Sequence, residues 1–134
     1  MTTDLSWLLD DLVARVPEVG KAVVLTRDGL PVGASATLSR EEAEWLCAIA
    51  AGFHGLAGGT AHELDGGFLR QVIVEMDAVF LLVTAAGAGC CLAVITSASA
   101  DVGLVAYEMA LLVKRLADQM AVPRRAVPVP AEAT

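Results

Sequence analysis

The feature that most constrains this chain is a run without a charged side chain, residues 78–100. The run is long enough for a membrane-spanning helix. Its centre reads AAGAGCC, however, with Gly87 and Gly89 where a helix would have to be continuous, and an aspartate rather than a basic anchor flanks each end. The segments VFLLVTA and CLAVITS on either side are of strand length and rich in branched or aromatic side chains. The run therefore predicts a buried β-hairpin and no transmembrane segment.

Helix and strand signals alternate along the rest of the chain. The first segment has leucines at helical spacing and ends at Pro17. Ser39, followed three residues later by Glu42, is a capping box that starts a second helix, and Asp101 opens the last one. The expected elements, in chain order, are a helix at 4–16, strands at 21–27 and 30–36, a helix at 39–57, strands at 68–76, 79–85 and 91–97, and a helix from 101. The resulting order is αββαβββα.

Length and composition indicate one domain followed by a tail. A chain of 134 residues, 56% of them hydrophobic, can form a single sizeable core. We expect this domain to comprise residues 1–121. Residues 122–134 are rich in proline and lack apolar periodicity, so we expect a mobile tail there.

Charge and cysteine content restrict the classes of function. A formal net charge of −7 argues against nucleic-acid binding, which needs a basic patch to displace counterions. Three cysteines, an odd number, argue against a disulfide framework and fit a reducing compartment. No stretch has the layout of a signal peptide. We therefore expect a cytoplasmic protein.

The sequence contains no motif that indicates catalysis, a cofactor or a metal. GLAGGT lacks the lysine of a phosphate-binding loop, and GAGCCL lacks the third glycine of a dinucleotide fingerprint. Cys90 and Cys91 are neighbours on an expected strand, so their side chains point to opposite faces. His54 and His62 lie too far from a cysteine pair for a zinc spacing. We expect no enzyme, no cofactor and no metal site.

The second helix has no charged side chain from Trp45 to His62, which is unusual for a solvated helix. On a helical wheel its bulky residues share one broad side, which we assign to the sheet: Trp45, Leu46, Ile49, Phe53 and Leu56. The opposite side is small, and we predict it to be the partner-binding surface: Ala48, Ala51, Gly52 and Gly55. Glycine inside a helix costs about 1 kcal/mol relative to alanine, so this surface implies close approach by another backbone. A weakly specified helix end is the alternative, and Trp45 fits either a core or an interface.

Three segments resemble the Roadblock/dynein light chain family: LLDDLVARVPEVGKAVVLTRDGLPVGAS, FLRQVIVEM and DVGLVAYEMALLVKRL. The likeness is to short bacterial members, which occur beside Ras-like small GTPases and sensor-kinase-like proteins, and it extends to about Met120. The resemblance implies an α+β fold with a five-stranded antiparallel sheet of order 2-1-5-4-3. It also implies that the middle helix covers one face of the sheet and the terminal helices cover the other.

The two edges of such a sheet differ in sequence. Asp28 and Gly29 predict a tight hairpin turn, and Pro31 follows in the returning strand, where proline is tolerated at a sheet edge. Proline there blunts the edge against unwanted pairing. The third strand has no proline, and the family uses this edge to pair with a second copy. We therefore expect a homodimer with an interface at Trp45, Phe68, Arg70, Val72 and Val74.

The resemblance also implies a function. Family members act as adaptors and regulators of small GTPases, and some accelerate GTP hydrolysis without donating a catalytic residue. We therefore expect a non-enzymatic, homodimeric regulator of a Ras-like GTPase in a bacterial signalling system, with a sensor-kinase-like protein as a further partner. The alternative is a sensory module that binds a small apolar ligand, because an interior rich in alanine and glycine could leave a cavity.

Overall fold

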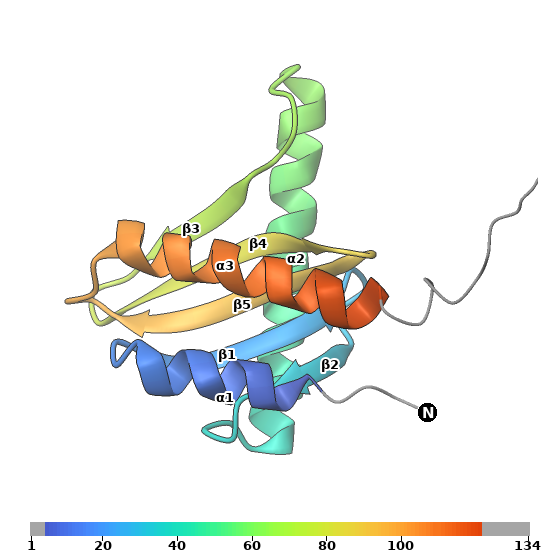
Figure 1. Ribbon diagram of the computed structural model, residues 1–134. Coiled ribbons are helices and arrows are strands. Elements are labelled where there is room, and N and C mark those ends of the chain that lie inside the picture. Colours follow the sequence, from blue (N-terminus) through green and yellow to red (C-terminus); the bar gives the residue numbers. More distant parts are fainter. Residues whose placement is uncertain (1–4, 122–134) are drawn as a thin grey trace, which may run out of the picture.

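The computed structural model describes residues 5–121 and has the expected order of elements (Figure 1). The predicted mobile tail, residues 122–134, lies outside the described residues. The elements are α1 (Ser6–Arg15), β1 (Val19–Thr26), β2 (Pro31–Ala34), α2 (Arg40–Glu63), β3 (Gln71–Glu75), β4 (Val79–Gly87), β5 (Cys90–Ser97) and α3 (Val102–Ala121).

Two expected boundaries, the end of the second helix and the start of the third strand, are wrong by three or more residues. Helix α2 continues through Gly58 and Gly59 to Glu63, because the chain leaves the helix only where Asp65 adopts a positive φ of 51°. There the Gly66 N–H donates to the Ala61 carbonyl at 2.8 Å and closes the helix end. Strand β3 is shorter than expected and begins at Gln71.

The five strands form one antiparallel sheet of order β2-β1-β5-β4-β3, as the resemblance implied. Helices α1 and α3 lie on one face of this sheet and α2 crosses the other (Figure 1). The fold class and the placement of the helices are therefore confirmed.

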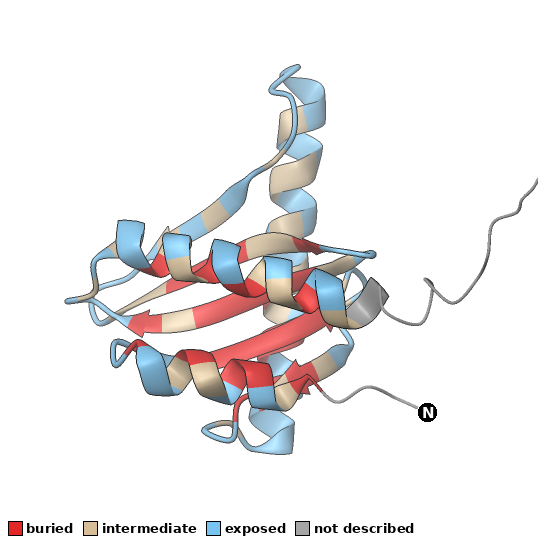
Figure 2. Ribbon diagram, viewed as in Figure 1, coloured by how far each residue is buried: buried red, intermediate tan, exposed pale blue. Residues whose placement is uncertain are grey.

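The central strands are buried on both faces, which Figure 2 shows as red arrows between the helices. In β1, Val24 packs toward α1 and α3 while Val23 packs toward α2. The same alternation holds for Leu82 and Leu81 in β4. Strands covered on both faces need apolar residues at every position. This explains the uncharged run at 78–100 as two such strands.

Turn geometry completes the two predicted hairpins. Gly29 has a positive φ of 93° in the β1–β2 turn, and the Thr26 N–H donates to the Leu30 carbonyl at 2.9 Å. In the β4–β5 turn, Gly87, Ala88 and Gly89 all have positive φ. Pro31 opens β2 at the edge of the sheet, where a missing N–H is tolerated. Within residues 5–121, no helix is both long and apolar enough to cross a membrane.

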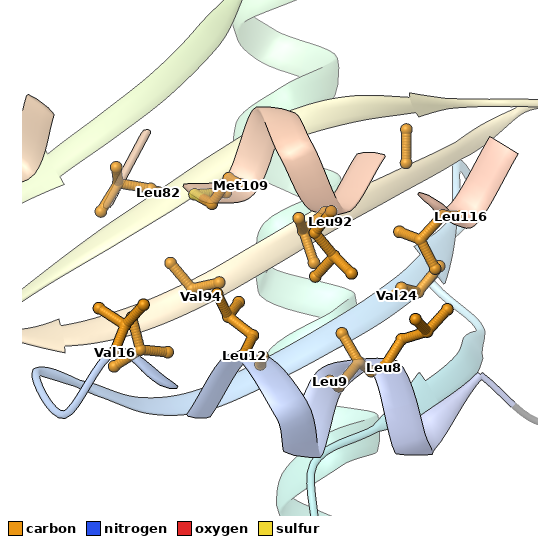
Figure 3. Close-up of a cluster of buried hydrophobic side chains, with 14 of the residues drawn as sticks. Leu8, Leu9, Leu12, Val16, Val24, Leu82, Leu92, Val94, Met109 and Leu116 are labelled. Carbon is orange, nitrogen blue, oxygen red and sulfur yellow. The ribbon is translucent and has the colours of Figure 1, made fainter. Parts of the chain in front are cut away.

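The larger core layer lies beneath α1 and α3 (Figure 3). The two helices bury residues at spacings of three and four, the pattern of an amphipathic helix: Leu8, Leu9 and Leu12 in α1, and Val105, Met109, Leu112 and Leu116 in α3. Ionic contacts join the outer sides of the two helices. Asp11 accepts from Arg15 Nε at 2.9 Å and from Arg115 Nη1 at 3.0 Å, and Arg15 Nη1 reaches Glu108 at 2.7 Å.

We expect Asp11→Asn to destabilise the fold by about 1 kcal/mol or less, because the pair is partly exposed. Hydrogen bonds from Arg115 and Arg15 lower the pKa of Asp11. A depressed carboxyl pKa contributes stability above its ordinary value, and this contribution is lost as the pH falls through the lowered pKa. Thermal unfolding should therefore separate the variant from the wild type at neutral pH and not in acid.

Asp118→Asn is the matched control, since Asp118 is exposed on α3 and forms no ion pair among residues 5–121. An equal effect of both substitutions, or a difference for Asp11→Asn that persists in acid, would contradict the role given to Asp11.

Candidate functional site

Helix α2 is fixed at its start by the predicted capping box. The Glu42 N–H donates to Ser39 Oγ at 3.1 Å, and the Ser39 N–H donates to Glu42 Oε1 at 2.9 Å. This second bond lowers the pKa of the Glu42 carboxyl. Leu38 precedes the cap and packs in the same core cluster as Ala43, at the two positions of a hydrophobic staple. The staple sets which side of α2 faces the sheet.

The side assigned to the sheet from the helical wheel is largely wrong. The sheet-facing residues of α2 are mostly small: Ala43, Leu46, Cys47 and Ala50. Leu46 was assigned correctly, and Ile49 is half-buried against the same cluster. Trp45 is 64% exposed, Leu56 75% and Phe53 39%. Small residues let the helix approach the sheet closely, so the bulky ones are left on the outside.

The exposed side of α2 therefore carries both bulky and small apolar residues. Trp45, Ala48, Gly52 and Leu56 follow one another at spacings of three and four, so they form one stripe along the helix. We call these four residues the α2 stripe. All four are exposed. Trp45 therefore lies on the surface and is not part of the core, and its place in an interface stays a prediction.

The predicted partner residues lie partly on this stripe. Ala48, Gly52 and Gly55 are exposed, whereas Ala51 is half-buried and faces the β1–β2 turn. A Cβ built on Gly29 of that turn would lie 3.5 Å from the Ala51 Cβ. A Cβ built on Gly52 or on Gly55 would meet no atom within 4 Å. Packing within residues 5–121 therefore gives no reason for glycine at these two positions.

The second half of α2 has little support from its own chain. The four buried residues of the helix all lie in its first half: Ala43, Leu46, Cys47 and Ala50. In Figure 1 the C-terminal half projects past the sheet, and the following loop returns to β3. A long apolar helix end that its own sheet does not cover is a surface suited to another chain.

Strand β3 is the second part of the candidate site, because it is an outer strand of the sheet. Val72 and Val74 are half-buried on the side of α2, while Ile73 points to the opposite face and is 46% exposed. Of the other predicted interface residues, Phe68 is 83% exposed and Arg70 is also exposed. Both lie in the loop before β3 and not on the strand.

The cysteines near α2 show no sign of unusual reactivity. Burial raises the pKa of Cys47 to about 11, so its thiol is inert at neutral pH. Cys90 and Cys91 pack on opposite faces of the sheet, as expected for neighbours on a strand. Residues 5–121 contain no group of three His, Cys, Asp or Glu side chains that could hold a metal. The exposed apolar surface of α2 is suited to binding another chain.

The chain matches the Roadblock/LC7 domain family over residues 5–96. It is similar to a Roadblock/LC7 domain from Streptomyces avermitilis, with 39% identity, a TM-score of 0.81, and coverage of 93% of this chain and 100% of that one. A second such domain from the same organism is 44% identical, with a TM-score of 0.69 and coverage of 83% and 96%. Myxococcus xanthus MglB, at 18% identity, shares the fold with a TM-score of 0.71 over 92% of this chain and 96% of its own. No curated protein matches the chain.

The seating of α2 can be tested through Cys47. With iodoacetamide at neutral pH, we expect Cys47 to stay unmodified in the folded protein, because its side chain is fully buried between α2 and the sheet. Glu41→Cys, at an exposed position in the first turn of the same helix, should be modified readily. Peptide mass spectrometry measures both. Equal rates at the two positions would mean that α2 does not lie on the sheet as described.

Proposed function

Since the chain belongs to the Roadblock/LC7 domain family, we propose that it is a non-enzymatic, homodimeric regulator of a Ras-like small GTPase in a bacterial signalling system. The observation that carries the proposal is the uncharged α2 stripe on a helix that packs beside the outer strand β3. Exposed apolar surface of this kind usually marks a protein interface. A sensor-kinase-like protein is a further candidate partner.

Homodimerisation is supported by the difference between the two sheet edges. Proline opens the short edge strand β2, whereas β3 has no proline and has three consecutive β-branched residues at its centre, Val72, Ile73 and Val74. An unblocked edge strand presents free N–H and C=O groups that can pair with another strand. Pairing of two copies of β3 about a two-fold axis would join the two sheets into one.

The same two-fold axis would bring the two α2 helices together. Helix α2 lies on the face of the sheet to which Val72 and Val74 of β3 point. An antiparallel pair of β3 strands related by the two-fold places both copies of α2 on one side of the joined sheet. The small side chain of Ala48, which is exposed on α2, then allows the helix backbones to approach closely at that part of the helix.

The proposed binding of a GTPase rests on the family resemblance and on the uncharged surface of α2. Family members regulate small GTPases, and Ala48, Ala51, Gly52 and Gly55 would admit a switch loop that long charged side chains would exclude. Gly52 lies at the centre of this set and of the α2 stripe. We therefore place the GTPase contact on this part of α2 and the dimer contact mainly on β3.

A second candidate function, a sensory module for a small ligand, is favoured by one observation. A cavity of about 320 Å³ lies between α2 and the sheet, lined by residues of α2, the loop before β3, and strands β4 and β5. Ligand pockets in proteins are usually about 300–1,000 Å³, so this cavity is large enough for a small molecule.

Two proline substitutions test the dimer through β3. Consecutive residues of a strand direct their N–H groups to opposite sides, so one of Val72 and Ile73 donates toward β4 and the other toward the open edge. We therefore expect Val72→Pro and Ile73→Pro to have different effects on the dimer and on the stability of the fold. One should lose the dimer while keeping its far-UV circular dichroism, and the other should lose stability by about 3 kcal/mol or more.

Analytical ultracentrifugation measures the oligomeric state of these variants. A wild-type protein that is monomeric at micromolar concentration would contradict the dimer. So would two folded proline variants that both remain dimeric.

Gly52→Arg tests the partner surface. The added side chain meets nothing within this chain, so we expect a folded protein that is still dimeric through β3 but no longer binds the GTPase. Gly52→Ala is the matched control. It should keep binding and gain up to about 1 kcal/mol in stability, because alanine is the better helix former. Isothermal titration with a GTP-loaded Ras-like small GTPase measures the affinity.

Two results would contradict the assignment of this surface to the GTPase. Unchanged affinity for Gly52→Arg would show that Gly52 lies outside the contact. Loss of the dimer together with GTPase binding would show that the α2 stripe belongs to the dimer contact instead.

A further inference from the structure

The cavity between α2 and the sheet is lined by residues from several elements. His54 and Gly58 come from α2, Phe68 and Leu69 from the loop before β3, and Cys91 from β5. Arg27, which directly follows β1, completes the lining. A Cβ built on Gly58 would meet no atom within 4 Å, so the absence of a side chain there keeps the space open.

His54 contributes a buried polar atom to this cavity. Its ring Nε2 is buried and has no hydrogen-bond partner among residues 5–121. A buried polar atom left without a partner costs about 1–3 kcal/mol. Burial and then the positive charge of Arg27 lower the pKa of His54, so the imidazole is neutral at neutral pH. A neutral imidazole can donate one hydrogen bond from Nε2.

Arg27 supplies a positive charge beside this ring. Arg27, His54 and Cys91 all line the same cavity. Burial raises the pKa of Cys91, and the positive charge of Arg27 partly opposes that increase. The structure shows no carboxylate within ion-pair distance of Arg27 in residues 5–121. The adjacent Asp28 accepts a hydrogen bond from Thr26 Oγ1 at 2.5 Å within the turn. The guanidinium therefore remains available for an anion.

We propose that this cavity binds a small monocarboxylic acid, with the carboxylate between Arg27 and His54 and the apolar body against Phe68 and Leu69. A planar guanidinium pairs well with a planar carboxylate through two parallel hydrogen bonds. One cation beside a neutral ring balances one negative charge, whereas a dianionic phosphate would bring a second charge into an otherwise apolar lining.

The inference rests on the second candidate function, and Phe68 of the cavity lining also belongs to the predicted dimer interface. The cavity also shares Ala51 and Gly55 with the predicted partner surface. A bound acid would thus lie directly behind the part of α2 that we assign to the GTPase.

The test is a titration of the ¹⁵N-labelled full-length protein at neutral pH, followed by amide chemical shifts. The probes are sodium benzoate and sodium hexanoate, each compared with its uncharged amide, benzamide and hexanamide. We expect the carboxylates to shift resonances of the cavity lining and to bind about tenfold or more tightly than the amides, because their hydrogen bonds are charge-assisted.

Three variants locate the site. Arg27→Gln should remove the preference for the carboxylates, and Gly58→Leu should weaken all four probes by filling the cavity. Arg40→Gln is the control, because Arg40 lies at the exposed start of α2, paired with Glu44 at 3.7 Å and outside the lining. This control should bind like the wild type.

Each contrary result has a distinct meaning. If the amides bind as tightly as the carboxylates, the carboxylate site is wrong while the ligand-binding module stands. If Arg27→Gln keeps the full preference for carboxylates, the role of Arg27 is wrong. If no probe shifts the cavity resonances, both the inference and the second candidate function are wrong.

Discussion

The burial of three adjacent strands on both of their faces is the constraint on which this structure depends. Strands β1, β5 and β4 lie in the middle of the sheet, and their residues alternate between two apolar layers. Such strands need a helical layer on each side. Helices α1 and α3 supply one layer and α2 the other. The uncharged run at 78–100 follows from this constraint and not from a membrane environment.

The outer elements are less completely covered, and the proposed interface lies there. Strand β3 is half-buried on the face of α2, while Ile73 remains exposed on the other face. The second half of α2 contributes no fully buried residue. The same helix bounds the cavity that contains His54 and Arg27. One helix therefore connects the proposed dimer, the proposed GTPase contact and the proposed ligand site.

More of the fold than of the candidate site could be predicted from the sequence. Strand spacing, the capping box and the glycine turns are local signals, and together with the family resemblance they predicted the element order and the sheet order correctly. The orientation of α2 depends on how closely the helix approaches the sheet, which residue size alone does not reveal. Leu38 and Ala43, at the staple positions, carried a usable signal. The cavity was not predictable in detail, because Arg27, His54 and Phe68 lie far apart in the sequence and meet only in the folded chain.

The central claim is that the open edge of β3 is covered by a second copy of the chain. Hydrogen exchange of the β3 amides, measured over a range of protein concentrations, tests it most directly. Amides that face β4 are protected within one chain, so the informative ones are the alternate amides on the open side. We expect these amides to be protected, with protection that increases with protein concentration. Exchange of every outward-facing β3 amide at the rate of an unstructured peptide, at all concentrations, would contradict the claim.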